Sequence, residues 1–246
     1  MKVALFVPCF IDALFPEVGI ATLELLEKLG VEVQYPLGQT CCGQPLVNSG
    51  CTADAAGTEK IFVDNFAGYD YVVAPSSSCV HHVRHHLLQA DTTPAVAAVR
   101  ASTYELSEFL HDVLEVRSFP WASFPHTVGL HNSCSAIRHL HAGSMSEIAG
   151  PQWSKARTLL EGVRDIRFAQ PSRPDECCGF GGTFAVSEEA VSVRMGLDKV
   201  RDHADAGADV IVSADVSCLM HQRGCAQRSE QPMRFVHIAQ VLNGNS

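Results

Sequence analysis

The chain repeats one pattern of cysteines, and this repeat restricts the possible folds more than any other feature of the sequence. In chain order the members are Cys9, Cys41, Cys42 and Cys79 in the first half, and Cys134, Cys177, Cys178 and Cys218 in the second. A glycine, Gly43 or Gly179, follows each adjacent pair. Self-similarity of this kind indicates two copies of one supersecondary unit. The sequence therefore predicts two similar halves.

Hydrophobic patterning around the cysteines predicts the same order of elements in each half. The expected strands are 2–7, 31–35 and 71–74 in the first half, and 127–130, 166–168 and 209–212 in the second. The expected helices are 17–29 and 53–66, then 153–162 and 188–206. Strands that alternate with helices are typical of a parallel sheet with helices packed outside it. We expect an α/β protein whose two halves, each a mainly parallel sheet flanked by helices, are related by a pseudo-two-fold repeat.

The chemistry-bearing residues fall where such a fold places ligands. Cys9, Cys79, Cys134 and Cys218 each come shortly after an expected strand. In open parallel sheets, ligands bind beyond the carboxyl ends of the strands. An apolar-periodic helix between residues 106 and 113 precedes the join of the halves. We place two cysteine-rich domains at 1–120 and 121–246.

Composition excludes several classes of protein. The formal net charge is −9, and the acidic residues are spread along the chain, which disfavours a nucleic-acid partner. No apolar stretch approaches the roughly 20 residues of a transmembrane helix. The first apolar run ends at Pro8 and reads as a strand rather than a secretory signal. We expect a cytoplasmic protein, in which ten cysteines are metal ligands or redox groups and not a disulfide framework.

The spacing favours an iron–sulfur cluster in one or both halves. Thiolates are the usual ligands of such clusters, and each half offers four. Adjacent cysteines point apart in extended backbone and suit two irons of a polynuclear cluster better than one tetrahedral ion. Gly43 and Gly179 permit a positive φ and let the backbone approach the cofactor. Two alternatives remain: buried apolar thiols, and a structural zinc site with Cys₄ or Cys₃His ligands.

Histidines add two possible ligands. His82 and His221 each follow the last cysteine of their half by three residues, so they match in the repeat. We expect ordinary polar roles for the other histidines near the cysteines, which are His81, His85, His86, His131, His139 and His141. Cys51 and Cys225 have no counterpart in the other half, and we expect incidental or packing thiols on helix or loop surfaces.

These residues resemble the CCG-domain family of cysteine-rich proteins. The motifs that carry the resemblance are Pro75-Ser76-Ser77-Ser78-Cys79, the run from Glu176 to Phe184, the run from Asp215 to His221, and the ending from Val236 to Leu242. The family includes the cysteine-rich component of heterodisulfide reductase, the iron–sulfur component of glycolate oxidase and lactate utilisation protein A. The chain is most similar to the last of these, since it has two CCG units and little else.

The resemblance implies a function that the residues alone do not. It implies a subunit of an oxidoreductase that takes part in oxidation of L-lactate to pyruvate, with a ferredoxin-type partner subunit and a third lactate-utilisation protein. The cofactor implied is [4Fe-4S], one or two per chain, held by the eight repeated cysteines. As a one-electron relay the chain needs no general base, and no catalytic residue is identified.

The sequence departs from the heterodisulfide reductase pattern at one point. There the last motif is Cys-x-x-Cys, whereas both halves here read Cys-x-x-His, at His82 and His221. Three types of cluster are therefore compatible with the sequence: a cubane, a noncubane, and a centre with mixed Cys/His ligands. A heterodisulfide-reductase-like or glycolate-oxidase-like subunit remains the first alternative. A zinc-stabilised structural protein without redox function is the second.

Overall fold

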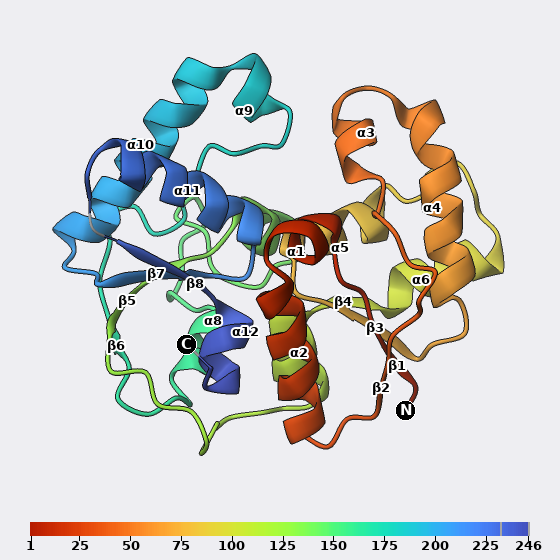
Figure 1. The fold of residues 1–246 in the computed structure, drawn as a ribbon, viewed down its shortest axis with the longest axis horizontal. Helices are drawn as coiled ribbons and strands as arrows, with labels where there is room; N and C mark the ends of the chain where they lie inside the picture. The colour runs from red at the N-terminus through yellow and green to blue at the C-terminus, as the bar shows by residue number, and fades with distance from the viewer. Residues whose placement is uncertain (232, 246) are drawn as a thin grey trace.

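The computed structural model describes residues 1–231 and 233–245, and these form two sheets of four parallel strands (Figure 1). The first sheet has the order β2-β1-β3-β4 and the second the order β6-β5-β7-β8. Strands of the first sheet are β1 (Val3–Leu5), β2 (Val33–Gln34), β3 (Tyr71–Ala74) and β4 (Thr103–Glu105). Those of the second sheet are β5 (Thr127–His131), β6 (Arg167–Phe168), β7 (Val210–Ser213) and β8 (Arg234–His237). The predicted α/β fold with two similar halves is confirmed.

Helices connect the strands in a similar order in each half, except that α6 (Pro94–Ser102), between β3 and β4, has no counterpart between β7 and β8. The first half contains α1 (Cys9–Leu14), α2 (Pro16–Lys28), α3 (Gln44–Asn48), α4 (Thr52–Phe66), α5 (Ser77–His85), α6 (Pro94–Ser102), α7 (Leu106–Glu108) and the π-helix η1 (Phe109–Val113). The second contains the π-helix η2 (Ser135–His139), α8 (Lys155–Leu160), α9 (Phe184–Ser187), α10 (Glu189–Asp205), α11 (Val216–Arg228) and α12 (Ile238–Asn243). The six strands and four helices expected from the sequence are all present, with ends shifted by a few residues.

Alternation along the strands divides the apolar residues between three layers. Val3 and Val73 face one side of the first sheet, and Val128, Val210 and Val212 face one side of the second; all five belong to a single buried core. The opposite face of the first sheet carries Ala4, Phe6, Val72 and Ala74, which pack under α4, α5 and α6. Successive strand residues point to opposite faces. The halves therefore share a central core and each has an outer core of its own.

The helices between the two sheets come from both halves. In Figure 1, α2 of the first half lies beside α12 of the second, and the two are in extensive contact. Lys28 Nζ donates to the carbonyl oxygen and to the side-chain oxygen of Asn243, both at 2.7 Å. The domain boundary near residue 120 remains a prediction, since the core is continuous across it.

A fourth strand in each sheet was not predicted. β4 and β8 are short edge strands, and the residue at the end of each, Glu105 or His237, caps the helix that follows through a capping box with Glu108 or Gln240. The alternating pattern is brief, because each strand passes into its helix without a loop. The apolar periodicity of residues 106–113 is real, but it forms α7 followed by η1 rather than one regular helix. Among the described residues, no helix is long and apolar enough to cross a membrane.

Candidate metal centre

The four repeated cysteines of the first half converge beyond the carboxyl ends of β1 and β3. Cys9 begins α1, Cys79 lies in the first turn of α5, and Cys41-Cys42 occupies the loop before α3. The Sγ atoms of Cys9 and Cys41 are 3.6 Å apart. Cys42 is within hydrogen-bonding reach of both Cys41 and Cys79. The chain of sulfur contacts joins all four thiols into one set.

The second half repeats this arrangement. Cys134 lies immediately before η2, Cys218 lies in the first turn of α11, and Cys177-Cys178 occupies the loop before α9. Cys177 is within hydrogen-bonding reach of Cys134 and Cys178, and Cys178 is in reach of Cys218 as well. Each set of four thiols predicted as ligands is therefore brought together by its own sheet.

Glycine makes the turn after each cysteine pair. Gly43 and Gly179 have φ angles of 93° and 91°, in the left-handed region that side chains rarely adopt. In that conformation the N–H of Gly43 donates to Cys41 Sγ and the N–H of Gly179 donates to Cys177 Sγ, each at 3.4 Å. A hydrogen bond from the backbone stabilises a thiolate and tunes a metal bound to it. The backbone therefore contacts one sulfur of each set, and its approach to a bound cofactor at Gly43 and Gly179 remains a prediction.

Hydrogen bonds between the thiols favour a thiolate at one cysteine of each set. Hydrogen bonds from Cys42 and Cys9 lower the pKa of Cys41 to about 2, whereas the pKa of Cys42 is raised because it donates to Cys41 and is buried. In the second half the pKa of Cys177 is likewise lowered to about 2, by hydrogen bonds from Cys134 and Cys178. Four thiolates at this spacing need a cation to balance them, and a metal ion that replaces the protons supplies that charge.

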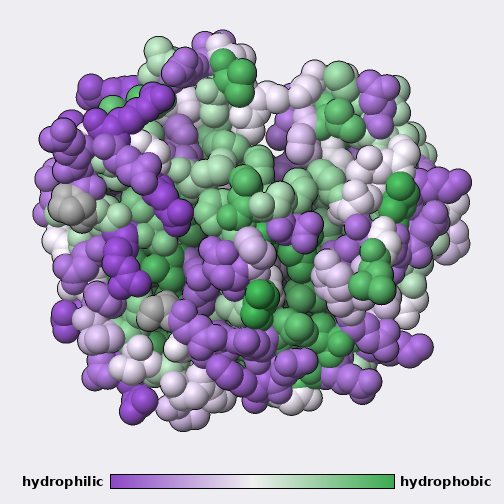
Figure 2. Space-filling model, in the orientation of Figure 1, coloured by the Kyte–Doolittle hydropathy of each residue, from purple (hydrophilic) through white to green (hydrophobic). Residues whose placement is uncertain are grey.

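Both sets line the same cavity. It has a volume of about 550 Å³, and all eight repeated cysteines lie on its wall. Phe10 of the first half and Phe180 of the second meet edge to face across it at 6.1 Å between ring centroids. Figure 2 shows the face on which a hollow lies between the lobe of α9 and α10 and the lobe of α3 and α4, with apolar residues beneath it. The two candidate centres therefore open toward each other.

A buried carboxylate joins the halves beside this cavity. Asp215 precedes α11, and Ser76 precedes α5 at the matching position of the repeat. Asp215 Oδ1 accepts hydrogen bonds from Ser76 Oγ at 2.9 Å and from the N–H and Oγ of Ser78, both at 3.2 Å. The two equivalent cap residues thus meet across the pseudo-two-fold axis, and they fix the sets of cysteines relative to one another.

The residues present fit an iron–sulfur cofactor. Four thiols come together from three separate segments in each half, all ten cysteines are free, and a backbone N–H already points at one sulfur of each set. The wall around them is mainly apolar, with Phe10, Phe180 and Met220 among the lining residues. Thiolate ligands, N–H donors and apolar surroundings are the usual environment of such clusters.

The two histidines of the Cys-x-x-His motifs point to neighbouring helices. His82 is 1% exposed, and its Nε2 lies 3.0 Å from Glu59 Oε1 on α4. His221 Nε2 lies 3.0 Å from the carbonyl oxygen of Ser192 on α10. These contacts join α5 to α4 and α11 to α10. Their role as additional metal ligands remains a prediction.

The structure places one further histidine, His131, at the second centre. His131 ends β5, is 1% exposed, and groups with Cys178 and Cys218 so that one ring nitrogen and both sulfurs lie within 4.8 Å of one another. The repeat does not single it out, and an ordinary polar role was expected for it. His131 lies three residues before Cys134, and the first half has Phe6 at the matching position. An alignment of the two halves would have shown this exchange of an apolar residue for a possible metal ligand.

Two other expectations concern the unmatched cysteines. Cys51 is exposed at the start of α4, as predicted. Cys225 was expected on a surface, but it is 3% exposed in the last turn of α11, where its Sγ faces α10 and would lie 2.5 Å from a Cβ at Gly196. The small residue Gly196 allows α10 and α11 to approach closely at this point. Cys225 therefore has a packing role, which was the other expectation for it.

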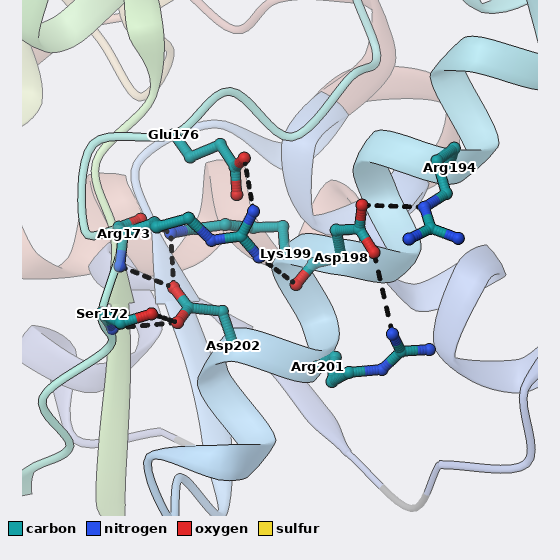
Figure 3. Close-up of polar contacts among 8 residues, drawn as sticks. All are labelled: Ser172, Arg173, Glu176, Arg194, Asp198, Lys199, Arg201 and Asp202. Atoms are coloured by element: carbon teal, nitrogen blue, oxygen red, sulfur yellow. Dashed lines mark hydrogen bonds and ion pairs between the residues drawn. The ribbon is translucent and has the colours of Figure 1, made fainter.

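A buried ionic network holds the loop that leads to Cys177 (Figure 3). Lys199 of α10 is fully buried, donates to the carbonyl oxygen of Arg173 and lies 3.6 Å from Asp202 Oδ2. Asp202 in turn accepts from the N–H and Oγ of Ser172, at 2.9 and 2.6 Å, and from the N–H of Arg173 at 3.1 Å. Arg173 also pairs with Glu176, the residue before Cys177, at 2.9 Å. The loop is thereby fixed to α10.

Comparison with known proteins agrees with this geometry. The family model described as CCG, cysteine-rich domain, matches residues 3–84 and again 128–223. Lactate utilization protein A of Halalkalibacterium halodurans is 40% identical over 99% of this chain and 97% of its own, and that of Exiguobacterium sp. is 42% identical over 98% and 97%. Lactate utilization protein A of Bacillus subtilis is 40% identical over 99% of both chains.

The similarity to solved structures is slight. A putative Asp/Glu racemase from Yersinia pestis covers 99% of this chain and 96% of its own, with 9% identity and a TM-score of 0.37. At that level the resemblance bears on neither mechanism nor substrate.

Proposed function

Since the chain belongs to the family of CCG cysteine-rich proteins that contains lactate utilization protein A, we propose that it is an iron–sulfur subunit of an L-lactate-oxidising complex. The observation that carries this proposal is the convergence of all eight repeated cysteines on one cavity. Cys9, Cys41, Cys42 and Cys79 hold one cluster, and Cys134, Cys177, Cys178 and Cys218 hold the other. Each is a [4Fe-4S] cluster in this proposal.

The proposed role is electron transfer. Oxidation of L-lactate to pyruvate releases two electrons and two protons, and an iron–sulfur cluster, when bound, accepts electrons one at a time. The chain's own residues keep the two sets of thiols on facing walls of one cavity, through the contact of Ser76 with Asp215. Apolar residues such as Phe10 and Phe180 limit the access of water between them. A transfer path from one half to the other therefore crosses a single cavity that is partly screened from solvent.

Partners and compartment follow from the same proposal. The electrons pass between this chain, a ferredoxin-type partner subunit and a third lactate-utilisation protein, because the relatives are named for lactate utilisation and this chain has no Cys-x-x-Cys-x-x-Cys run. Ten free cysteines suit a reducing compartment, and we propose the cytoplasm. Residues 1–120 and 121–246 are proposed as the two repeated units.

The first test is the content of iron and acid-labile sulfide per chain after purification without oxygen, with EPR of the reduced protein. About eight irons per chain, as expected for two [4Fe-4S] clusters, support the proposal in full. About four irons restrict it to one half. Zinc without sulfide would contradict the iron–sulfur proposal and favour a zinc-stabilised structural protein. The grouping of His131 with Cys178 and Cys218 is compatible with such a zinc site.

A second test addresses the substrate. L-lactate added to the assembled complex should reduce the clusters of this chain, whereas glycolate should do so much more slowly. A disulfide substrate that alters the EPR signal of the isolated protein, with no response to lactate in the complex, would favour the heterodisulfide-reductase-like alternative.

A further inference from the structure

His131 is buried beside the second set of cysteines without a hydrogen-bond partner. Its side chain is 1% exposed, and among the described residues neither Nδ1 nor Nε2 finds a partner. A buried polar group that forms no hydrogen bond costs about 1–3 kcal/mol. Buried polar groups in native proteins are generally bound to a hydrogen-bond partner, a water molecule or an ion. We therefore expect a ring nitrogen of His131 to bind a group in the site.

The nearest candidates are the sulfurs of the second set. One ring nitrogen of His131 lies within 4.8 Å of both Cys178 Sγ and Cys218 Sγ, which are themselves within 4.8 Å of each other. Thiolates and imidazoles that bind one iron–sulfur cluster surround it from several sides. The ring nitrogen and the two sulfurs are already gathered at one place in the site, where a single cluster could be bound by them. The imidazole approaches from β5, beneath the wall that the cysteines form.

The first half has no such group at the matching position. Phe6 also lies three residues before the first cysteine of its half, and it packs on Phe62 and Phe66 of α4 with ring centroids 4.8 and 5.6 Å away. The first centre is therefore backed by three aromatic rings. None of them offers a ligand atom.

The second half replaces this aromatic wall by nitrogen-bearing side chains. Lys199 and His203 lie one turn apart on α10, as Phe62 and Phe66 do on α4, and His203 meets His131 at 6.4 Å between ring centroids. The missing side chain of Gly129 makes room for this pair, because a Cβ there would lie 2.5 Å from His203 Nδ1. The two phenylalanines of α4 are therefore replaced together with Phe6, by Lys199, His203 and His131.

We propose that His131 is a protein ligand of the second metal centre, so that the two centres of the chain are chemically different. This inference rests on the proposed iron–sulfur function. The second half offers five ligand atoms, four sulfurs and one imidazole nitrogen, where the first half offers four sulfurs. A [4Fe-4S] cluster takes four protein ligands, so in this proposal the imidazole takes the place of one of the four thiolates. Such a replacement raises the reduction potential of an iron–sulfur centre, as does a buried cation such as Lys199 close by. The second centre therefore has the higher potential, and electrons that reach the chain settle on it.

The test uses the full chain purified without oxygen, in which iron and sulfide have been measured. Pulsed EPR of the reduced wild-type protein, grown with ¹⁴N- or ¹⁵N-histidine, should show a nitrogen coupling that changes with the isotope. The substitution His131→Phe, which installs the residue of the first half, should abolish that coupling. The matched substitution His221→Phe should retain it, because His221 Nε2 faces Ser192.

A redox titration followed by EPR gives a second readout. In His131→Phe the signal of one centre should move to lower potential while that of the other stays in place. The isotope comparison needs no variant, so absence of a histidine coupling in the wild-type protein overturns the assignment even where His131→Phe fails to fold.

The outcomes separate this inference from the function on which it rests. A wild-type protein that holds iron and sulfide but shows no histidine nitrogen coupling would overturn the assignment of His131 alone. Loss of the coupling in His221→Phe, with retention in His131→Phe, would also overturn it. Wild-type protein without iron or sulfide would overturn the proposed function together with this inference.

Discussion

At the scale of single residues, the glycine of a Cys-Cys-Gly turn is required for two reasons: the backbone has a positive φ, and a neighbouring helix leaves no room for a side chain. Gly179 has a φ of 91°, and a Cβ on it would lie 2.7 Å from both Met195 Cβ and the carbonyl oxygen of Ser192 on α10. Gly207, at the end of α10, has a φ of 77° but nothing within 4 Å of a Cβ. Both glycines have a positive φ, but only Gly179 is in close contact with its surroundings. A comparison of the two therefore distinguishes the energetic cost of the backbone conformation from that of the close contact.

We therefore expect Gly179→Ala to be much more damaging than Gly207→Ala. A left-handed alanine costs about 1–2 kcal/mol in either position. In Gly179→Ala the clash with α10 adds about 1–3 kcal/mol and displaces Cys177 and Cys178. Chemical denaturation and iron content after anaerobic purification measure the two effects. Equal stability of the two variants, with full iron in both, would show that the close approach is unimportant.

The ligand assignment makes a separate prediction for the thiols. Cys41→Ser and Cys177→Ser should each lower the iron content by about half if both sets hold a cluster, because each removes a thiolate from one set. Cys51→Ser should leave it unchanged, since Cys51 is exposed and lies outside both sets. Iron and sulfide assays on the three variants check this. The same iron content in all three would eliminate the eight cysteines as the ligand set.

The sequence predicted the eight cysteines because their identity and order repeat. It did not predict His131, because a search for repeated residues passes over a position at which the halves differ. Phe6 and His131 occupy that position, and only the packing of α4 and α10 shows that the difference extends to a whole buried wall. The spacing of the motifs shows which residues the two halves have in common. The packing around each set of cysteines shows where the halves differ.

At the scale of secondary-structure elements, the junction of β4 with α7 contains a buried ionisable group. Glu105 is 1% exposed, and its Oε2 accepts a hydrogen bond from the N–H of Ser107 at 2.8 Å while its Oε1 has no partner among the described residues. Burial, followed by repulsion from Glu108 and Asp215, raises the pKa of Glu105 to about 8. The folded protein therefore binds a proton here that the unfolded chain releases near pH 4.5.

This proton makes stability depend on pH. The folded state binds more protons than the unfolded state between about pH 4.5 and 8, so the stabilisation is fully present below pH 4.5 and is lost as the pH rises through about 8. We expect Glu105→Gln to flatten this decline, which amounts to about 2–4 kcal/mol. Urea unfolding at several pH values measures it. Glu32→Gln, at a position away from this junction, should keep the wild-type slope, and an unchanged slope in Glu105→Gln would contradict the assignment.

The sequence predicted most elements, and the reason for the failures is physical. Long amphipathic helices such as α2, α4 and α10 have enough turns for a clear 3.6-residue period. The edge strands β4 and β8 pass directly into capped helices, so no loop marks where each strand ends. Pairing with β3 and β7 defines these strands, and such long-range pairing has no local signal.

At the scale of the whole molecule, the two repeated units depend on a common core. Leu25 of α2 and Leu242 of α12 are both fully buried in the cluster that spans the two halves. Glu24 Oε2 accepts a hydrogen bond from Asn243 Nδ2 at 2.6 Å, next to the bonds from Lys28 to Asn243. A unit of the sequence repeat is therefore not a unit of stability, since separation of the halves would expose this core on both.

We predict that the chain unfolds in one cooperative transition. A destabilising substitution in either half should lower the midpoint temperature of that transition. Leu242→Ala should cost about 2–5 kcal/mol, and Leu25→Ala a similar amount, because each leaves a cavity in the shared core. Ile20→Ala, at a position of α2 that is 57% exposed, should cost less than about 0.5 kcal/mol. Calorimetry of the metal-free chain measures all three. Two resolved transitions, with Leu242→Ala lowering only one, would instead show that each half folds on its own, and the central helices would then be a docking surface between two domains rather than their common core.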